Sequence, residues 1–195
     1  YLDRERSESG KKKFDLVVNG ERVFVLGTNL VPTDIFPAVG DTLTERELAL
    51  VTEIGCNAVR IWGGGVYRSD EFYDRCDELG LLVWQDFMMA CAIYPQDAEF
   101  AALMKKEAES VVKRLRNHPS VALWAGDNEC DDFWLMFGNN GRLSGKRGAA
   151  LDPNSNILTR AVIPTAVSDH DGTRPYLPSS PYRDEDSVKR GEPSP

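Results

Sequence analysis

The chain of 195 residues has 42% hydrophobic and 28% charged residues, the composition of a globular protein with room for a sizeable core. Its 23 Lys and Arg against 31 Asp and Glu give a formal net charge of −8, which argues against nucleic acid as a partner because phosphate binding needs clustered cations. No stretch approaches the roughly 20 apolar residues of a membrane span, so no membrane partner is expected.

The first part of the chain predicts a linker, a hairpin and a strand. Residues 1–13 are polar and lack the apolar core of a signal peptide, so we expect them to connect the fold to an upstream segment. Asn19-Gly20 lies between two β-rich runs, which is the strongest short signal of a β-hairpin. Residues 23–29 continue as a buried strand.

Helices and strands then alternate. Thr44 and Glu47 predict a capping box that begins a helix, and Gly55 ends that helix. The later elements are, in chain order, a strand at 57–65, a helix from Ser69 to Leu79 closed by Gly80, a strand at 81–87, a helix at 97–117 stopped by Pro119, a strand at 121–129, a glycine-rich loop at 138–154, a helix at 157–168 that Pro164 should kink, and a short strand at 174–181.

This alternation is typical of a parallel sheet with right-handed crossovers, either an open doubly wound sheet or a (β/α)8 barrel. Polar or glycine-rich tips follow three successive strands, as WGGG, WQDF and GDNE, and such tips favour the barrel. A complete barrel takes about 250 residues. We therefore expect an α/β fold, a partial (β/α)8 barrel of about five β/α units with a short β-hairpin before it, over residues 14–182, and a polar tail over 183–195.

The tip Gly126-Asp127-Asn128-Glu129 holds the candidate catalytic acid. A glutamate just past a buried strand can lie in a partly dry pocket, where desolvation raises its pKa and lets it carry a proton. Asn128 can bind a substrate hydroxyl, and Asp127 can tie down a loop. The alternative is that Asp127 and Glu129 form structural ion pairs with arginines of neighbouring strands. Calcium is not expected, because DNECDD lacks the loop length and the glycine of an EF-hand.

Further candidate binding residues flank this tip. Arg60 and Trp62 lie on one face of a strand at period two, either as a cation for a carboxylate and a platform for a sugar ring or as ordinary barrel packing. Asp86 either binds a sugar hydroxyl or holds Arg60. Trp134 and Phe137 either line a carbohydrate cleft or pack a loop.

No cofactor or metal is expected. The three glycines at 63–65 do not form GxGxxG before a helix, so they predict a close backbone approach and no dinucleotide site. Zinc would need closely spaced ligand pairs, whereas no two cysteines are spaced as CxxC and the chain has two histidines. We expect four free thiols, at Cys56, Cys76, Cys91 and Cys130.

Four segments together resemble the β-mannosidase branch of glycoside hydrolase family 2. They are NGERVFVLGTNLVPTD, NAVRIWGGGVYRSDEFYDRCDELGLLVWQDFMMACAIYP, RLRNHPSVALWAGDNE and RPYLPSSPY. The resemblance covers roughly Phe14 to Tyr182, and the block from WGGG to WQDFMMAC points to the mannosidases of this family and away from its β-galactosidases.

The resemblance implies a (β/α)8 barrel behind β-sandwich domains and a retaining mechanism with two carboxylates. By this resemblance Glu129 is the general acid/base, Asn128 lies near the sugar 2-hydroxyl and Trp62 packs against the mannoside. The family's nucleophilic glutamate follows strand seven, and no glutamate of this chain matches it. Phe137 stands where the family often has tryptophan.

The function expected from this resemblance is removal of terminal β-D-mannose from β-linked oligosaccharides by an exo-acting enzyme. We expect this chain alone to be inactive without the nucleophile and prone to self-association through the open barrel edge. The alternatives are another sugar specificity in the family (β-galactoside, β-glucuronide or β-glucosaminide) and a non-catalytic carbohydrate-binding barrel.

Overall fold

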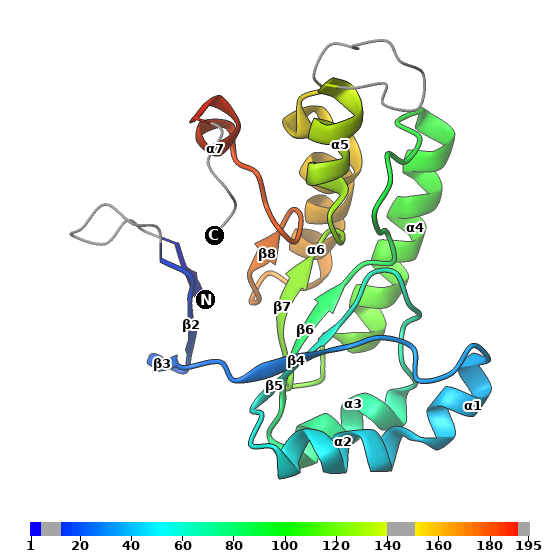
Figure 1. Ribbon diagram of the computed structural model, residues 1–195, viewed down its shortest axis with the longest axis vertical. Helices are drawn as coiled ribbons and strands as arrows, with labels where there is room; N and C mark the ends of the chain where they lie inside the picture. The colour runs from blue at the N-terminus through cyan, green and yellow to red at the C-terminus, as the bar shows by residue number, and fades with distance from the viewer. Residues whose placement is uncertain (5–12, 140–150, 191–195) are drawn as a thin grey trace.

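The computed structural model describes residues 1–4, 13–139 and 151–190, and its main feature is a parallel sheet (Figure 1). The strands are β4 (Gly27–Leu30), β5 (Ala58–Ile61), β6 (Leu82–Asp86), β7 (Val121–Ala125) and β8 (Tyr176–Leu177). Each strand pairs in parallel with the next along the chain. A doubly wound sheet would reverse this order at one point. The predicted partial (β/α)8 barrel is therefore confirmed.

The helices lie between successive strands in the chain, except for α7, which follows β8. They are α1 (Pro37–Thr42), α2 (Thr44–Glu53), α3 (Asp70–Leu79), α4 (Ala98–Leu115), α5 (Cys130–Asn139), a 3₁₀ turn η1 (Pro153–Ser155), a π-helical turn η2 (Leu158–Val162), α6 (Ile163–His170) and α7 (Glu185–Arg190). In the described part of the chain, no helix has both the length and the apolar character that crossing a membrane requires.

The sheet buries its two faces against different partners because side chains alternate along a strand. On one face Val59, Val83 and Trp124 share a core with the apolar sides of α2, α3, α4 and α6. On the other face Leu123 and Leu177 form a smaller cluster, against which Leu2 and Trp84 pack. Helices packed on a single face are the arrangement of a barrel wall.

A small antiparallel sheet precedes the barrel strands. It consists of β1 (Leu2–Asp3), β2 (Asp15–Val18) and β3 (Glu21–Val23) in sequential order. Asn19 and Gly20 connect β2 to β3 with φ angles of 51° and 87°, so the predicted hairpin is confirmed. The predicted linker at 1–13 begins inside this sheet, because β1 pairs with β2. Phe14 stacks on Trp84 of β6 with ring centroids 5.6 Å apart, which places the hairpin against the barrel wall.

The predicted capping box at Thr44 is wrong. Leu43 occupies the N-cap position of α2, and no side chain caps it. The hydroxyl of Thr44 instead accepts a hydrogen bond from Arg68 at 3.2 Å, and Glu47 pairs with the same guanidinium at 2.6 Å. Leu43 alone separates α1 from α2, and Arg68, which belongs to neither helix, stabilises the start of α2 through these two contacts.

Three other predictions need adjusting. The helix expected at 157–168 begins as the π turn η2, which precedes Pro164 in the first turn of α6. The loop expected at 138–154 lies largely outside the described residues, and α5 and η1 occupy its two ends. The tail expected at 183–195 contains α7. The chain thus forms more helix after β7 than its composition indicates.

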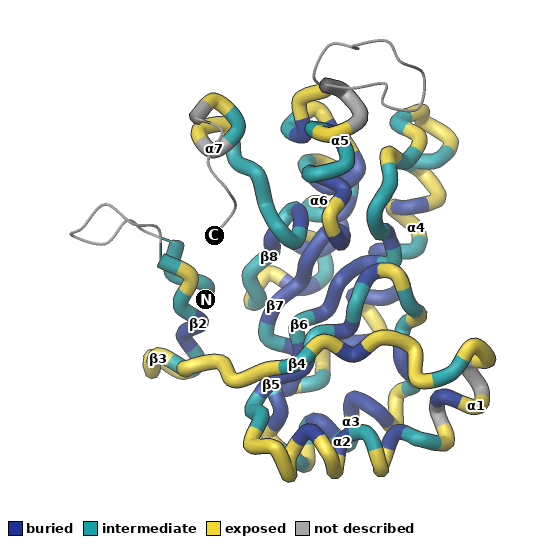
Figure 2. Tube along the Cα trace, viewed as in Figure 1, coloured by how far each residue is buried: buried dark blue, intermediate teal, exposed yellow. Residues whose placement is uncertain are grey.

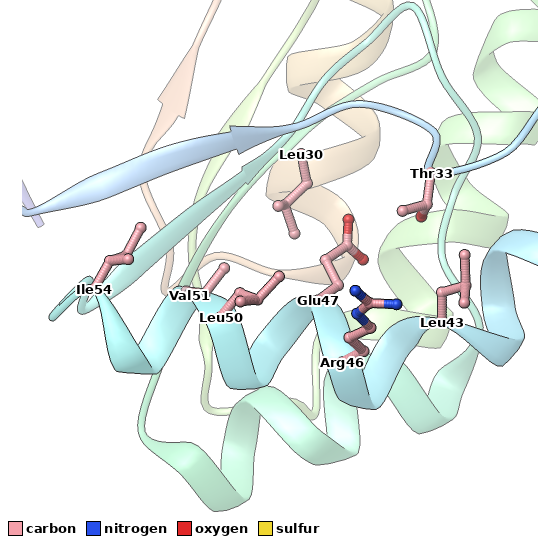
Figure 3. A pocket seen from close by; sticks show the side chains of 8 residues that line it. All are labelled: Leu30, Thr33, Leu43, Arg46, Glu47, Leu50, Val51 and Ile54. Carbon is pink, nitrogen blue, oxygen red and sulfur yellow. The ribbon is translucent and has the colours of Figure 1, made fainter.

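The β4 side of the molecule is the most exposed part of the sheet. Figure 2 shows β6 and β7 mostly buried, whereas β3 and the beginning of β4 are exposed. A cavity of about 420 Å³ lies between β4 and α2, where Leu30 points toward α2 (Figure 3). It is lined by Leu30, Thr33, Leu43, Arg46, Glu47, Leu50, Val51 and Ile54. None of the predicted site residues lines it, so this cavity is separate from the candidate site.

Candidate active site

The carboxyl ends of β5, β6 and β7 bring most of the predicted site residues together. Arg60 belongs to β5, Asp86 is the last residue of β6, and Asn128 and Glu129 follow β7. Because these strands are parallel neighbours, their carboxyl ends meet at one edge of the sheet, where catalytic groups of (β/α)8 barrels lie.

Arg60 and Asp86 form a two-point ion pair at the centre of this edge. The guanidinium donates to the two carboxylate oxygens at 2.6 and 3.2 Å. Asp86 is fully buried and also accepts from the Gly63 amide at 3.1 Å and from the Trp84 indole at 2.9 Å. Burial raises the pKa of Asp86 to about 6, although Arg60 and these donors act against the rise. Of its two predicted roles, Asp86 holds Arg60.

Asn128 is fixed at both ends of its side chain. Its Oδ1 accepts a 2.8 Å hydrogen bond from Arg60, and its Nδ2 donates to the Cys91 sulfur at 3.4 Å. Its backbone N–H donates to the Met89 carbonyl at 2.9 Å. The carboxamide is therefore preorganised by the same guanidinium that Asp86 orients.

Glu129 is the exposed member of this group, so the partly dry pocket predicted around it is not formed by the described residues. Its backbone is left-handed, with φ of 61°, and its N–H donates to the Ser180 carbonyl at 3.0 Å. Its carboxylate accepts a hydrogen bond from the Cys91 thiol at 3.3 Å. Among the described residues no Lys or Arg lies within ion-pair distance of Glu129 or Asp127, so the alternative of structural ion pairs finds no support in this part of the chain.

Asp127 points away from Glu129 into the protein. One carboxylate oxygen accepts from the Cys130 amide at 3.2 Å and from the Ser179 hydroxyl, and its backbone carbonyl accepts from Ser180 at 3.1 Å. The other oxygen is buried with no hydrogen-bond partner in the described part of the chain. Burial raises the pKa of Asp127 to about 7, with a smaller contribution from Asp131. Asp127 thus ties β7 to the segment after β8.

Glycine is required after β5 because neighbouring atoms lie close to the backbone there. A Cβ on Gly63 would lie 2.7 Å from the carbonyl oxygens of Phe87 and Met89, so the β5 tip touches the β6 tip through backbone alone. A Cβ on Gly64 would overlap the Trp62 ring. The half-buried Trp62 indole therefore lies over the glycine turn, next to the amide that Asp86 binds.

The two aromatic residues of α5 that were predicted to bind substrate are placed differently from this group. Trp134 is only 6% exposed, and its indole N–H has no acceptor among the described residues. Such a side chain packs inside the protein and offers little surface to a ligand. The side chain of Phe137 lies outside what the structure describes.

Three residues of the site were not predicted from the sequence. Trp84 donates to Asp86, Asn29 accepts from Arg60 at 3.4 Å, and Cys91 contacts both Asn128 and Glu129. Trp84 and Asn29 could have been found, because they occupy the same strand face or strand end as Arg60. Cys91 carries no such signal, since a left-handed turn after β6 places it.

Away from this site, one group of two aspartates and a histidine meets the geometry of metal ligands. Within the described residues Asp74, Asp77 and His118 can bring one ligand atom each within 4.8 Å of the others. Asp77 already accepts from His118 and from the Ser120 amide, each at 2.8 Å. These bonds link α3 to the turn before β7, which is a structural role. The four cysteines are free, as predicted.

The sequential parallel strands and the buried ion pair, amide and exposed carboxylate at their carboxyl ends define part of a (β/α)8-barrel enzyme domain. The model of glycosyl hydrolases family 2, TIM barrel domain, matches residues 11–154, and the chain belongs to this family.

Known relatives of the chain are β-mannosidases. The chain is 39% identical over 188 residues to β-mannosidase of Bos taurus, with 93% of this chain and 21% of the relative covered. It is 35% identical over 173 residues to β-mannosidase B of Thermothelomyces thermophilus, with 87% and 20% covered. The crystal structure of β-D-mannosidase from Dictyoglomus thermophilum is 41% identical and superposes with a TM-score of 0.81 over 95% of this chain and 22% of that one. The chain spans about one fifth of the length of these proteins.

More distant structures share the fold alone. The exo-chitosanase of Amycolatopsis orientalis is 23% identical, with a TM-score of 0.63 over 90% of this chain and 18% of that one.

Proposed function

We propose that this chain is part of the catalytic barrel of a retaining, exo-acting glycoside hydrolase that removes terminal β-D-mannose from oligosaccharides, with Glu129 as general acid/base. The observation that carries the proposal is the exposed Glu129 carboxylate at the β7 tip, beside an amide fixed by a buried ion pair. The similarity to β-mannosidases over nearly the whole chain supports mannose as the sugar.

In this mechanism Glu129 transfers protons and forms no covalent bond. Its carboxyl group protonates the glycosidic oxygen as the bond to the anomeric carbon breaks, and its carboxylate then takes a proton from the attacking water. The exposure of Glu129 suits both steps, because leaving group and water must reach the same carboxylate. A second carboxylate, about 5–5.5 Å from the acid/base in retaining enzymes, must attack the anomeric carbon. We place it outside this chain.

Of the surrounding residues, some hold the site in place and others contact the substrate. Asp86 and Arg60 fix the Asn128 carboxamide, which we propose binds the sugar near its 2-hydroxyl. Trp62, half-buried over the glycine turn, has ring surface for stacking on the sugar. Trp134 is too buried to make such a contact in this conformation, so we assign it to packing.

The experiment compares substrates with good and poor leaving groups in a full-length protein that carries this chain. We expect hydrolysis of 4-nitrophenyl β-mannoside and of a β-linked mannose disaccharide. Glu129→Gln should slow the disaccharide reaction by about 10²–10⁴-fold, the usual contribution of general acid–base catalysis. It should slow the aryl glycoside much less at the bond-breaking step, because 4-nitrophenolate leaves without protonation.

Controls separate this proposal from its alternatives. The 195-residue chain alone should show no turnover, and turnover lost in its Glu129→Gln variant would place a second catalytic carboxylate within the chain or its oligomer. Aryl β-galactoside, β-glucuronide and β-glucosaminide test the specificity. An equal loss of kcat/KM, which reports the bond-breaking step, on both mannosides in the full-length variant would contradict an acid/base role. Sugar binding without turnover in either protein would favour a non-catalytic barrel.

A further inference from the structure

We propose that Cys91 is a positioning residue for the acid/base carboxylate, with its thiol joining Glu129 and Asn128 into one hydrogen-bonded unit. The inference rests on the function proposed for Glu129, but the contact itself can be tested without catalysis.

The thiol lies between the two side chains that the proposed mechanism uses. Its S–H donates to Glu129 Oε2 at 3.3 Å, and its sulfur accepts from Asn128 Nδ2 at 3.4 Å. Because Asn128 Oδ1 is bound by Arg60, a continuous series of polar contacts runs from the buried ion pair to the exposed carboxylate. Cys91 is the last residue in this series, and through its thiol the buried network fixes the orientation of the Glu129 carboxylate.

The backbone aims the thiol at this position. Cys91 and Glu129 are both left-handed, with φ of 51° and 61°, a conformation that residues other than glycine seldom adopt. Such conformations persist where surrounding contacts fix them, and they gather at functional sites. The Cys91 N–H donates to the Asn128 carbonyl at 2.8 Å, and Ala90 forms a parallel bridge with Asn128. The tips of β6 and β7 are thus paired beyond their strands, which brings thiol and carboxylate together.

The thiol is suited to donate and not to react. Burial raises the pKa of Cys91, and the Glu129 carboxylate raises it further, while Asn128 acts in the opposite direction. A thiol that keeps its proton supplies an S–H donor, although a weak one. A donor to the carboxylate limits the rotation of an exposed, flexible side chain. Loss of this donor should therefore leave the Glu129 carboxylate less well oriented.

The first test measures thiol alkylation in the 195-residue chain at neutral pH, with iodoacetamide and peptide mass spectrometry. Only the thiolate reacts. Replacing the carboxylate by an amide of the same shape, as Glu129→Gln, should raise the alkylation rate of Cys91 by roughly twofold or more, because the nearby negative charge is gone. Cys56, also half-buried, is the internal control and should not change. An unchanged ratio of Cys91 to Cys56 rates would overturn the proposed contact.

The second test compares kcat/KM for a poor and a good leaving group in the full-length protein. Cys91→Ala should lower kcat/KM for the β-linked mannose disaccharide by about two- to fivefold and change kcat/KM for 4-nitrophenyl β-mannoside much less, because only the disaccharide needs a well-oriented proton donor. Cys91→Ser restores a donor to Glu129 and should keep the native ratio of the two values, as should the control Cys56→Ala. An unchanged ratio for Cys91→Ala, or the same change in the alanine and serine variants, would overturn the positioning role. A wild-type protein without glycosidase activity would refute the proposed function, while the alkylation result would still decide the contact.

Discussion

Asp127 is expected to make this protein less stable as the pH rises from about 4 to about 7. Its carboxyl group is fully buried, and burial raises its pKa to about 7 from an ordinary 3.8. A group with a raised folded pKa contributes stability that is complete below the unfolded pKa and is lost as pH rises through the folded pKa. The window for Asp127 is therefore about pH 4 to 7. One pKa unit corresponds to about 1.4 kcal/mol, so the ionised side chain costs up to about 4 kcal/mol at pH 8.

The substitution Asp127→Asn removes this cost and preserves the hydrogen bonds. The amide oxygen can still accept from Ser179 and the Cys130 amide, and the amide nitrogen replaces an oxygen that has no partner in the described residues. We expect the variant to be about as stable as the native chain at pH 4 and more stable at pH 8, by part of that 4 kcal/mol. Urea unfolding followed by tryptophan fluorescence, at steps from pH 4 to 8, measures this difference.

Asp171→Asn is the matched control with the opposite sign. Burial acts to raise the pKa of Asp171, but hydrogen bonds from Trp124, Thr173 and Arg174 outweigh it and lower the pKa. Its contribution is present above the unfolded pKa of about 3.8 and is lost only as the pH falls below that value, so this variant should lose about 1–3 kcal/mol throughout the range from pH 4 to 8. If the two variants changed the unfolding free energy in parallel across this range, the reasoning about Asp127 would be refuted.

Three further predictions concern the barrel wall. Gly63→Ala should lower the unfolding free energy by about 1–3 kcal/mol, because its Cβ would lie 2.7 Å from two backbone oxygens. The control Gly40→Ala should be neutral or mildly stabilising, because its Cβ would lie no nearer than 3.7 Å to any other atom. Equal melting temperatures for the two variants would contradict this prediction. Arg60→Met leaves Asp86 buried without its cation and should cost about 3–5 kcal/mol. Adding Asp86→Asn should recover part of that loss, and a purely additive double variant would argue against a coupled pair. The isolated chain should self-associate in sedimentation velocity, and Ile54→Glu, at a position 70% exposed beside the β4 cavity, should weaken association; a monomer at every concentration would refute this prediction.

The barrel wall could be predicted because its signals are local. The alternation of strands and helices, the Asn19-Gly20 turn and the polar tips of three strands each depend on a few neighbouring residues. The ion pair of Arg60 with Asp86 appeared as one of two alternatives. Parallel pairing of β5 with β6 decides between them, because it places both side chains on the same face.

The errors come from contacts between residues distant in sequence. The predicted capping box was wrong because Arg68, from the segment before α3, binds the side chains of both Thr44 and Glu47. Cys91 was not predicted as a site residue because left-handed residues after β6 and β7 bring it to Glu129, and spacing along the sequence does not predict that contact. Trp134 suggested a cleft by its nearness in sequence to Glu129, but α5 turns it into the interior.

The stacking of Phe14 on Trp84 has a consequence for where this protein can be cut. The indole that rests on Phe14 with one face also donates its N–H to Asp86, whose other partners are Arg60 and the turn at Gly63. A truncation between the hairpin and β4 would therefore remove Phe14 from the Trp84 ring and expose the Asp86 carboxylate to water. Expression variants meant to preserve the acid/base end of the barrel should retain the hairpin from Phe14 onward, since the Phe14 ring covers the indole that binds the buried Asp86.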